Sequence, residues 1–158
     1  FPNSTIHGFN SHEPSIEVAR GKAKEAELSN VEFFVSTAKE IPNNGYNFAC
    51  IFDALHDMGD PVGAATHVRS TLKDDGIFMV VEPFAGDSLE DNMTLLGRVS
   101  YAASTMVCTQ ASLAQEVGLA LGAQAGQKRL TEVLNEAGFS QVRRAAETEA
   151  NIVLEVRV

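Results

Sequence analysis

The sequence predicts an α/β protein built on a mostly parallel β-sheet. Apolar runs of strand length alternate with segments whose apolar residues recur every three or four positions, as in strands that alternate with helices. The run 48–52 is apolar throughout, which burial on both faces of a parallel sheet requires. The last two expected strands are separated only by residues 147–150, a link that allows an antiparallel hairpin but not a parallel return.

The first third of the chain reads as strand, helix and strand. Residues 4–9 form the first expected strand, and Pro14 stands where the first turn of a helix tolerates proline. The apolar face of this helix is formed by Ile16, Ala19, Ala23 and Ala26. Residues 31–35, rich in β-branched and aromatic residues, are the second expected strand. A turn at 42–45 then leads to the apolar strand 48–52, in which Cys50 is expected to be a small core residue.

A second helix and a fourth strand follow. Asp60 and Pro61 are typical of an N-cap and a first-turn proline. The apolar face of the helix is formed by Val62, Ala65, Val68 and Leu72. We expect the segment 74–76 to end this helix, and residues 77–81 to form a strand that stops at Glu82 and Pro83.

The C-terminal part contains one more helix and the hairpin. We expect a helix over 125–137 that ends at Gly138, then strands over 141–145 and 151–158. Residues 84–124 do not fit the alternation. We expect a helical insertion there, with helices over about 88–106 and 111–121. Because the insertion follows a strand end, it is expected to lie over the ligand edge of the sheet, either as a lid on an acceptor pocket or as hydrophobic packing or a subunit interface.

The charge balance excludes several classes of partner. The formal net charge is −9 and the chain has no basic patch, so we expect no nucleic-acid partner. No apolar run reaches membrane-spanning length, and no signal peptide is recognised, so we expect no membrane association. The two cysteines are far apart in the sequence, which favours a cytoplasmic location.

Four motifs occur in the order and spacing found in one enzyme family. They are Ile6 to Asn10, Phe33 to Pro42, Phe52 to Asp57, and Leu72 to Gly76 before the strand that ends in Glu82-Pro83. From residue 4 to residue 158 the chain resembles class I S-adenosylmethionine-dependent methyltransferases. The stretches 56–61 and 115–122 are similar to a bacterial group that carries an N-terminal winged-helix domain.

The resemblance implies a Rossmann-like sheet, S-adenosylmethionine as cofactor, and methyl transfer to a small-molecule acceptor. Residues 1–158 then correspond to a partial methyltransferase domain. The family's first strand and its glycine-rich loop are not in the chain, so we expect activity to be impaired in this chain alone. We also expect a homodimer, because unpaired strand edges recruit other chains. The alternative is a degenerate methyltransferase-like module that binds a ligand or partner without catalysis.

The resemblance also implies positions for the cofactor. Asn10, followed by Ser11, stands where the family has an acid that binds the ribose. Thr37 and Ala38 stand where the family commonly has Asp-Ala beside the adenine, and the other implied cofactor contacts are Phe52, Asp53 and Ala54. An amide and a hydroxyl accept hydrogen bonds less strongly than carboxylates do. Turn and loop roles for Asn10 and Thr37 therefore stay open.

His56 is the expected catalytic residue. It follows the strand end near the position that the family gives to the departing methyl group, and imidazole can take a proton near neutral pH. The structural alternative is that His56 caps a loop or packs under the lid. Glu82 and Tyr101 are expected to orient the acceptor, although a strand-end Glu can instead bind the backbone. No metal is expected, because the other histidines show no ligand spacing.

Overall fold

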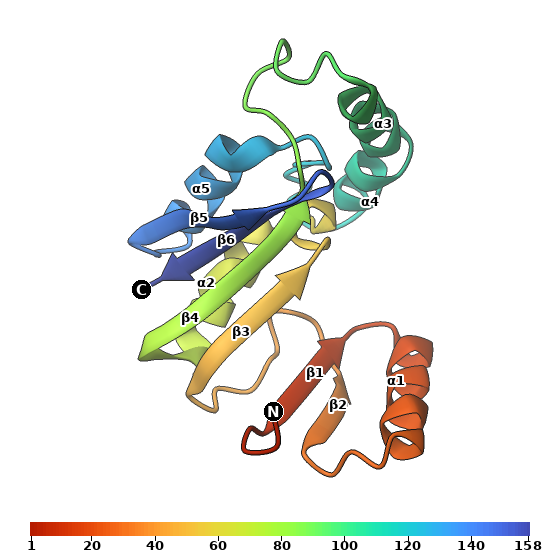
Figure 1. Ribbon diagram of the computed structural model, residues 1–158, viewed down its shortest axis with the longest axis vertical. Helices are drawn as coiled ribbons and strands as arrows, with labels where there is room; N and C mark the ends of the chain where they lie inside the picture. The colour runs from red at the N-terminus through yellow and green to blue at the C-terminus, as the bar shows by residue number, and fades with distance from the viewer. The chain divides into compact units, whose positions relative to one another are not determined.

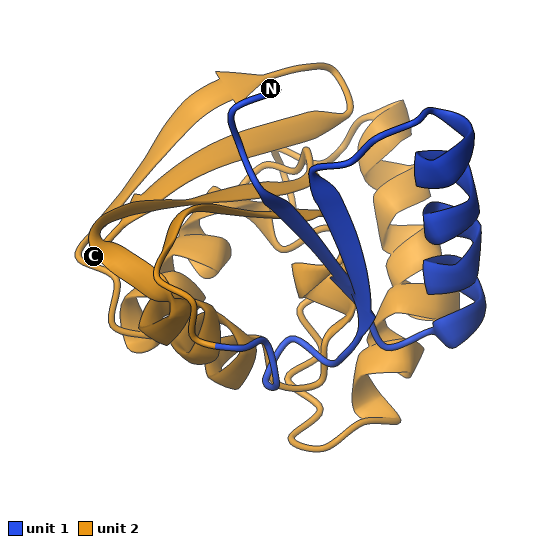
Figure 2. Cartoon of the chain, turned by 90° about the horizontal axis from the view of Figure 1, so that it is seen from below, with its two compact units in different colours: residues 1–42 blue, residues 43–158 orange.

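The computed structural model describes residues 1–158, which divide into two units, residues 1–42 and residues 43–158 (Figure 2). The first unit contains two parallel strands and a helix. Its elements are β1 (Ile6–Asn10), α1 (Glu13–Glu25) and β2 (Val31–Val35). Asn10 pairs with Val35 at the carboxyl ends of these strands. The expected elements of this region are confirmed, with the first strand shifted toward Asn10.

The second unit is built on a four-stranded sheet with the order β3-β4-β6-β5 (Figure 1). Its strands are β3 (Tyr46–Phe52), β4 (Leu72–Pro83), β5 (Gln141–Glu147) and β6 (Asn151–Arg157). β3 and β4 are parallel, whereas β6 is antiparallel to both β4 and β5. The predicted α/β fold with a parallel sheet and a C-terminal antiparallel hairpin is therefore confirmed. The parallel ladders join β1 to β2 in the first unit and β3 to β4 in the second.

Two helices of the second unit, α2 (Pro61–Thr71) and α5 (Gly126–Glu136), pack against each other beside the sheet. The sheet residues in this core alternate along β4 and β6: Phe78, Val80, Ile152, Leu154 and Val156 are all buried. Alternation follows from the two-residue period of a strand. Glu82 continues the buried series of β4 and is its one charged member.

The caps expected for these two helices are confirmed. The Asp60 side chain accepts a hydrogen bond from the Gly63 amide at 2.8 Å, which begins α2. Gly138 follows α5 with φ 94°, a left-handed conformation that favours glycine. The expected end of α2 at 74–76 is wrong, because the helix stops at Thr71 and β4 begins at the next residue.

Two other expectations about the second unit need correction. β3 is not buried on both faces: Phe48, Cys50 and Phe52 are exposed. These side chains are two residues apart and share one face of β3, which is therefore uncovered. The prediction that both faces of β3 are buried is therefore wrong, and Cys50 is exposed and not a core residue.

The insertion at 84–124 contains one interrupted helical segment in place of two separate helices. It comprises α3 (Leu95–Ala103), a π-helical turn η2 (Ser104–Cys108) and α4 (Thr109–Leu113). Residues 117–122 include four positive φ angles, which end the helical path before the second expected helix is complete. None of the helices is long and apolar enough to cross a membrane.

Candidate active site

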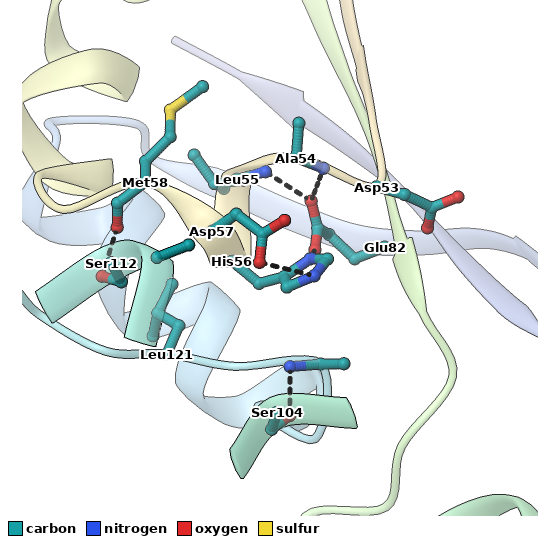
Figure 3. Close-up of polar contacts among 12 residues, drawn as sticks. Asp53, Ala54, Leu55, His56, Asp57, Met58, Glu82, Ser104, Ser112 and Leu121 are labelled. Carbon is teal, nitrogen blue, oxygen red and sulfur yellow. Dashed lines mark hydrogen bonds and ion pairs between the residues drawn. The ribbon is translucent and has the colours of Figure 1, made fainter. Parts of the chain in front are cut away.

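The carboxyl end of β3 turns sharply, and this turn creates the site. Asp53 has φ 45°, a left-handed conformation that Asp tolerates better than most residues. The short 3₁₀ helix η1 (Leu55–Asp57) begins two residues later. The turn directs the amides of Ala54 and Leu55 toward the carboxylate of Glu82, at 3.2 and 2.8 Å from Oε1 (Figure 3).

His56 and Glu82 form a buried pair at the centre of the site. Glu82 Oε2 lies 2.5 Å from His56 Nδ1, and the two residues are 1% and 4% exposed. A buried carboxylate needs such partners, since an unpaired buried charge is costly. One oxygen of Glu82 thus accepts from two backbone amides, while the other holds the imidazole ring.

The charges around His56 raise its pKa. Burial by itself lowers the pKa, but the hydrogen bond and negative charge of Glu82 outweigh it, with help from Asp57 and Asp53. Asp57 Oδ1 lies 3.3 Å from Nε2, on the ring nitrogen that Glu82 leaves free. The site is therefore arranged to stabilise a protonated imidazole.

Asp57 and Cys108 complete a group of three potential metal ligands with His56. Their ligand atoms lie within 4.8 Å of one another. Burial, followed by the hydrogen bond and charge of Asp57, raises the pKa of the Cys108 thiol. A cysteine binds a metal as its thiolate, which a raised pKa disfavours. We therefore interpret this group as a hydrogen-bonded cluster.

Asp53 is held at the rim of the site by a residue that the sequence analysis missed. Asn151 Nδ2 donates to Asp53 Oδ1 at 2.7 Å. Asn151 begins β6 and pairs with Pro83 at the carboxyl end of β4. The antiparallel hairpin was predicted, and pairing its last strand against 77–83 could have found Asn151.

The sequence-predicted site residues fall into two groups, one in each unit. In the first unit, Asn10 and Ser11 lie at the carboxyl end of β1, beside the segment after β2 that carries Thr37 and Ala38; the Ser36 amide donates to the Asn10 carbonyl at 3.1 Å. The Asn10 side-chain oxygen accepts from the His12 amide at 2.8 Å. Thr37 Oγ1 donates to Glu40 Oε2 at 2.8 Å. Asn10 thus makes a turn hydrogen bond and Thr37 a loop hydrogen bond, the local roles that stand as alternatives to cofactor binding.

In the second unit the structure brings Phe52, Asp53, Ala54, His56 and Glu82 together. Phe52 is 59% exposed and Asp53 is also exposed, whereas His56 and Glu82 are buried. Tyr101 lies on α3 and is partly exposed. A surface hollow of about 490 Å³ is lined by residues of α1 and β2 and by residues between them, and contains none of the predicted site residues. The polar geometry around His56 therefore identifies the site better than surface shape does.

Several of the solved structures that resemble this chain are methyltransferases. The mitomycin 7-O-methyltransferase MmcR has a TM-score of 0.69 and 20% identity, over 100% of this chain and 43% of that one. The O-methyltransferase NcsB1 of neocarzinostatin biosynthesis, in complex with S-adenosyl-L-homocysteine and 1,4-dihydroxy-2-naphthoic acid, has a TM-score of 0.69 and 19% identity, over 96% and 41%. A methyltransferase of Aquifex aeolicus has a TM-score of 0.66 and 15% identity, over 96% and 68%.

The chain thus spans less than half the length of the first two of these proteins. At such identities the likeness establishes the fold. A comparison with curated proteins found no match. A family model described as a methyltransferase domain matches residues 1–138. Because this match covers most of the chain, the protein belongs to the methyltransferase domain family.

Proposed function

We propose that this domain transfers a methyl group from S-adenosylmethionine to a hydroxyl oxygen of a small molecule, with His56 as general base. The observation that carries the proposal is the buried pair of His56 and Glu82 at the carboxyl end of β3 and β4. Ligands bind at this edge in open α/β sheets. A hydroxyl must lose its proton as it accepts a methyl group, and a positioned imidazole performs such a transfer.

Glu82 determines which nitrogen of His56 acts. Its carboxylate accepts from Nδ1–H at 2.5 Å, which leaves the lone pair on Nε2. When Nε2 takes the proton of the acceptor, the imidazolium is stabilised by Glu82 and Asp57. In this proposal Glu82 orients the base and does not contact the acceptor, because it is 1% exposed and both its oxygens already have hydrogen-bond partners.

The cofactor, when bound, supplies a methyl group already activated on a sulfonium, so catalysis requires mainly alignment and exclusion of water. The residues that would hold it are those at the strand ends: Asn10, Ser11, Thr37 and Ala38 in one unit, and Phe52, Asp53 and Ala54 in the other. Their donor set fits a nucleoside. In the first unit Asn10 offers an amide oxygen, and in the second unit Phe52 offers an exposed aromatic ring and Asp53 a carboxylate; both oxygens retain lone pairs beyond their present hydrogen bonds.

The acceptor is expected to reach His56 from the side of the helical insertion. His56 is 4% exposed, and its carbonyl accepts from the Gly122 amide at 3.3 Å. An acceptor therefore contacts Nε2 only when the covering segment moves, as a lid does. We expect Tyr101, which lies on α3, to be on the side of the site from which the acceptor enters.

We further propose a cytoplasmic protein that acts as a homodimer and does not bind nucleic acid. The net charge of −9 opposes binding to phosphates. The exposed apolar residues of the helical insertion support a subunit contact; they are Leu95, Leu96, Val99, Met106, Val107 and Leu113. Both cysteines are free thiols, as in a reducing compartment.

The test is a methyl-transfer assay with S-adenosylmethionine and a panel of small phenols, carried out on the complete protein. His56→Gln should lower the rate by about 10²–10⁴-fold. The matched control is His67→Gln, which changes a histidine on α2 outside the site and should leave the rate unchanged. Cofactor binding without transfer to any hydroxyl acceptor would contradict the enzyme and favour a ligand-binding module.

A further inference from the structure

Gln115 fastens the segment that carries His56 to the end of α4. Its Nε2 donates to the Asp57 carbonyl at 2.9 Å and to the Ala111 carbonyl at 2.9 Å. Its Oε1 accepts from the Gly59 amide at 3.0 Å. One side chain thus satisfies both a donor and an acceptor of the backbone immediately after His56.

Ser112 reinforces the same connection from one turn earlier. Its hydroxyl donates to the Met58 carbonyl at 2.8 Å and accepts from the Ala120 amide at 3.0 Å (Figure 3 shows the first of these). Ser112 is fully buried. We call the side chains of Ser112 and Gln115 the clasp.

Backbone contacts show how closely the two segments approach. The Leu119 amide donates to the Gly59 carbonyl at 2.9 Å. A Cβ at Gly59 would lie 2.5 Å from Gln115 Cβ and 2.5 Å from the Glu116 carbonyl oxygen, so only glycine fits there. The clasp therefore acts over a tightly fitted contact.

The loop after the clasp is strained. Val117 has φ 71° and Ala120 has φ 55°. A left-handed conformation is unfavourable for residues with a Cβ, and most of all for β-branched valine. Such strain persists only where surrounding contacts hold it, and it often marks functional sites. The backbone of this loop is held by Gly59 and His56, whose carbonyls accept from Leu119 and Gly122, and by Ser112, whose hydroxyl accepts from Ala120.

We propose that Gln115 is a positioning residue for His56. By holding the backbone of residues 57–59, it keeps the Asp57 carboxylate beside Nε2 while Glu82 fixes Nδ1 from β4. This inference rests on the proposed function, because it takes His56 to be the base. The contact of Gln115 with residues 57–59 does not depend on that function. The titratable groups that face the ring are Glu82 of β4, Asp57 and Asp53 of the strand-end turn, and Cys108 of η2.

The first measurement is an NMR pH titration of the His56 ring in the complete chain, which needs neither cofactor nor acceptor. In Gln115→Ala we expect the midpoint of His56 to fall, because Asp57 is released from Nε2. Gln115→Glu keeps the acceptor for the Gly59 amide and loses the donor to the Asp57 carbonyl, so it should give a smaller shift. Gln110→Ala, the same substitution on the exposed face of α4, is the control and should titrate as the wild type does.

The second measurement is the steady-state rate. Gln115→Ala should lower kcat by about 10- to 100-fold through misplacement of the base, while KM for S-adenosylmethionine stays as in the wild type. A His56 titration identical in Gln115→Ala and wild type would overturn the positioning role, whatever happens to the melting temperature. A shifted titration in a protein without any methyl transfer would support the contact and overturn the proposed function instead.

Discussion

Replacing Glu82 by Gln tests the chemistry of the site most directly. Gln has the same shape, and its carbonyl oxygen can still accept from the Ala54 and Leu55 amides that Glu82 now binds. Its NH₂ group then faces His56 Nδ1, which must become an acceptor. The ring proton moves to Nε2, and Nε2 can no longer take a proton from an acceptor hydroxyl.

Glu82→Gln should lower both the rate and the stability of the protein. Loss of the correct tautomer should lower kcat by about 10²–10⁴-fold, the usual contribution of a general base. The variant also loses one charge-assisted hydrogen bond in a buried setting, about 1.5–3 kcal/mol of stability when His56 is charged. Because the amide still satisfies the two backbone donors, we expect the variant to fold.

The stability difference between wild type and Glu82→Gln should depend on pH in a definite direction. Glu82 and its neighbours raise the pKa of folded His56 above its ordinary value of 6.5. The resulting stabilisation is fully present below that ordinary value and is lost as the pH rises through the folded pKa. The difference in unfolding free energy between wild type and Glu82→Gln should therefore be largest in mildly acidic solution and shrink in mildly alkaline solution.

Two measurements check these expectations. Urea unfolding at a series of pH values gives the stability difference, and ¹⁵N NMR of histidine-labelled protein gives the tautomer of His56. The reasoning is refuted if the stability difference is independent of pH, or if Glu82→Gln retains both the Nδ1–H tautomer and the wild-type rate.

Three further substitutions test separate parts of the structure. Asp60→Ala removes the N-cap of α2 and should cost about 1 kcal/mol in urea unfolding; an unchanged midpoint would show that the cap is dispensable. Gly59→Ala places a Cβ against Gln115 and should cost about 1–3 kcal/mol, whereas Gly21→Ala, on the exposed side of α1 where a Cβ meets nothing, should stabilise the protein by about 0.5–1 kcal/mol. Asn10→Asp should tighten S-adenosylmethionine severalfold in calorimetric titration of the complete protein, since charged acceptors form stronger hydrogen bonds, about 1.5–3 against about 1 kcal/mol; equal or weaker binding would place the ribose elsewhere.

Local signals in the sequence predicted most of the elements. The Asp60-Pro61 start of α2, the Gly138 end of α5 and the hairpin of β5 and β6 are each encoded by one or a few neighbouring residues. The interrupted helical segment 95–113 was predicted less well. Its composition favours helix throughout, and the left-handed residues that end the path, such as Val117, carry no sequence signature of that conformation.

Local sequence signals also predicted part of the candidate site. His56 and Glu82 stood out because each follows an apolar run, where parallel strands deliver side chains to one edge. Their direct pairing was not predicted, because it depends on the register of β3 and β4 and on the turn at Asp53. Gln115 lay in a stretch that the sequence analysis had noted, but its partners at Asp57 and Gly59 are more than fifty residues away.

By itself, the sequence determined the fold class, the order of strands and helices, and the residues at the strand ends, because hydrophobic period and turn chemistry act over a few residues. Only the tertiary structure decided that Glu82 is the buried partner of His56. It also decided that β3 is half exposed and that the insertion is bound to residues 56–59. Burial and hydrogen bonding between distant residues depend on which elements meet, and no local pattern specifies that.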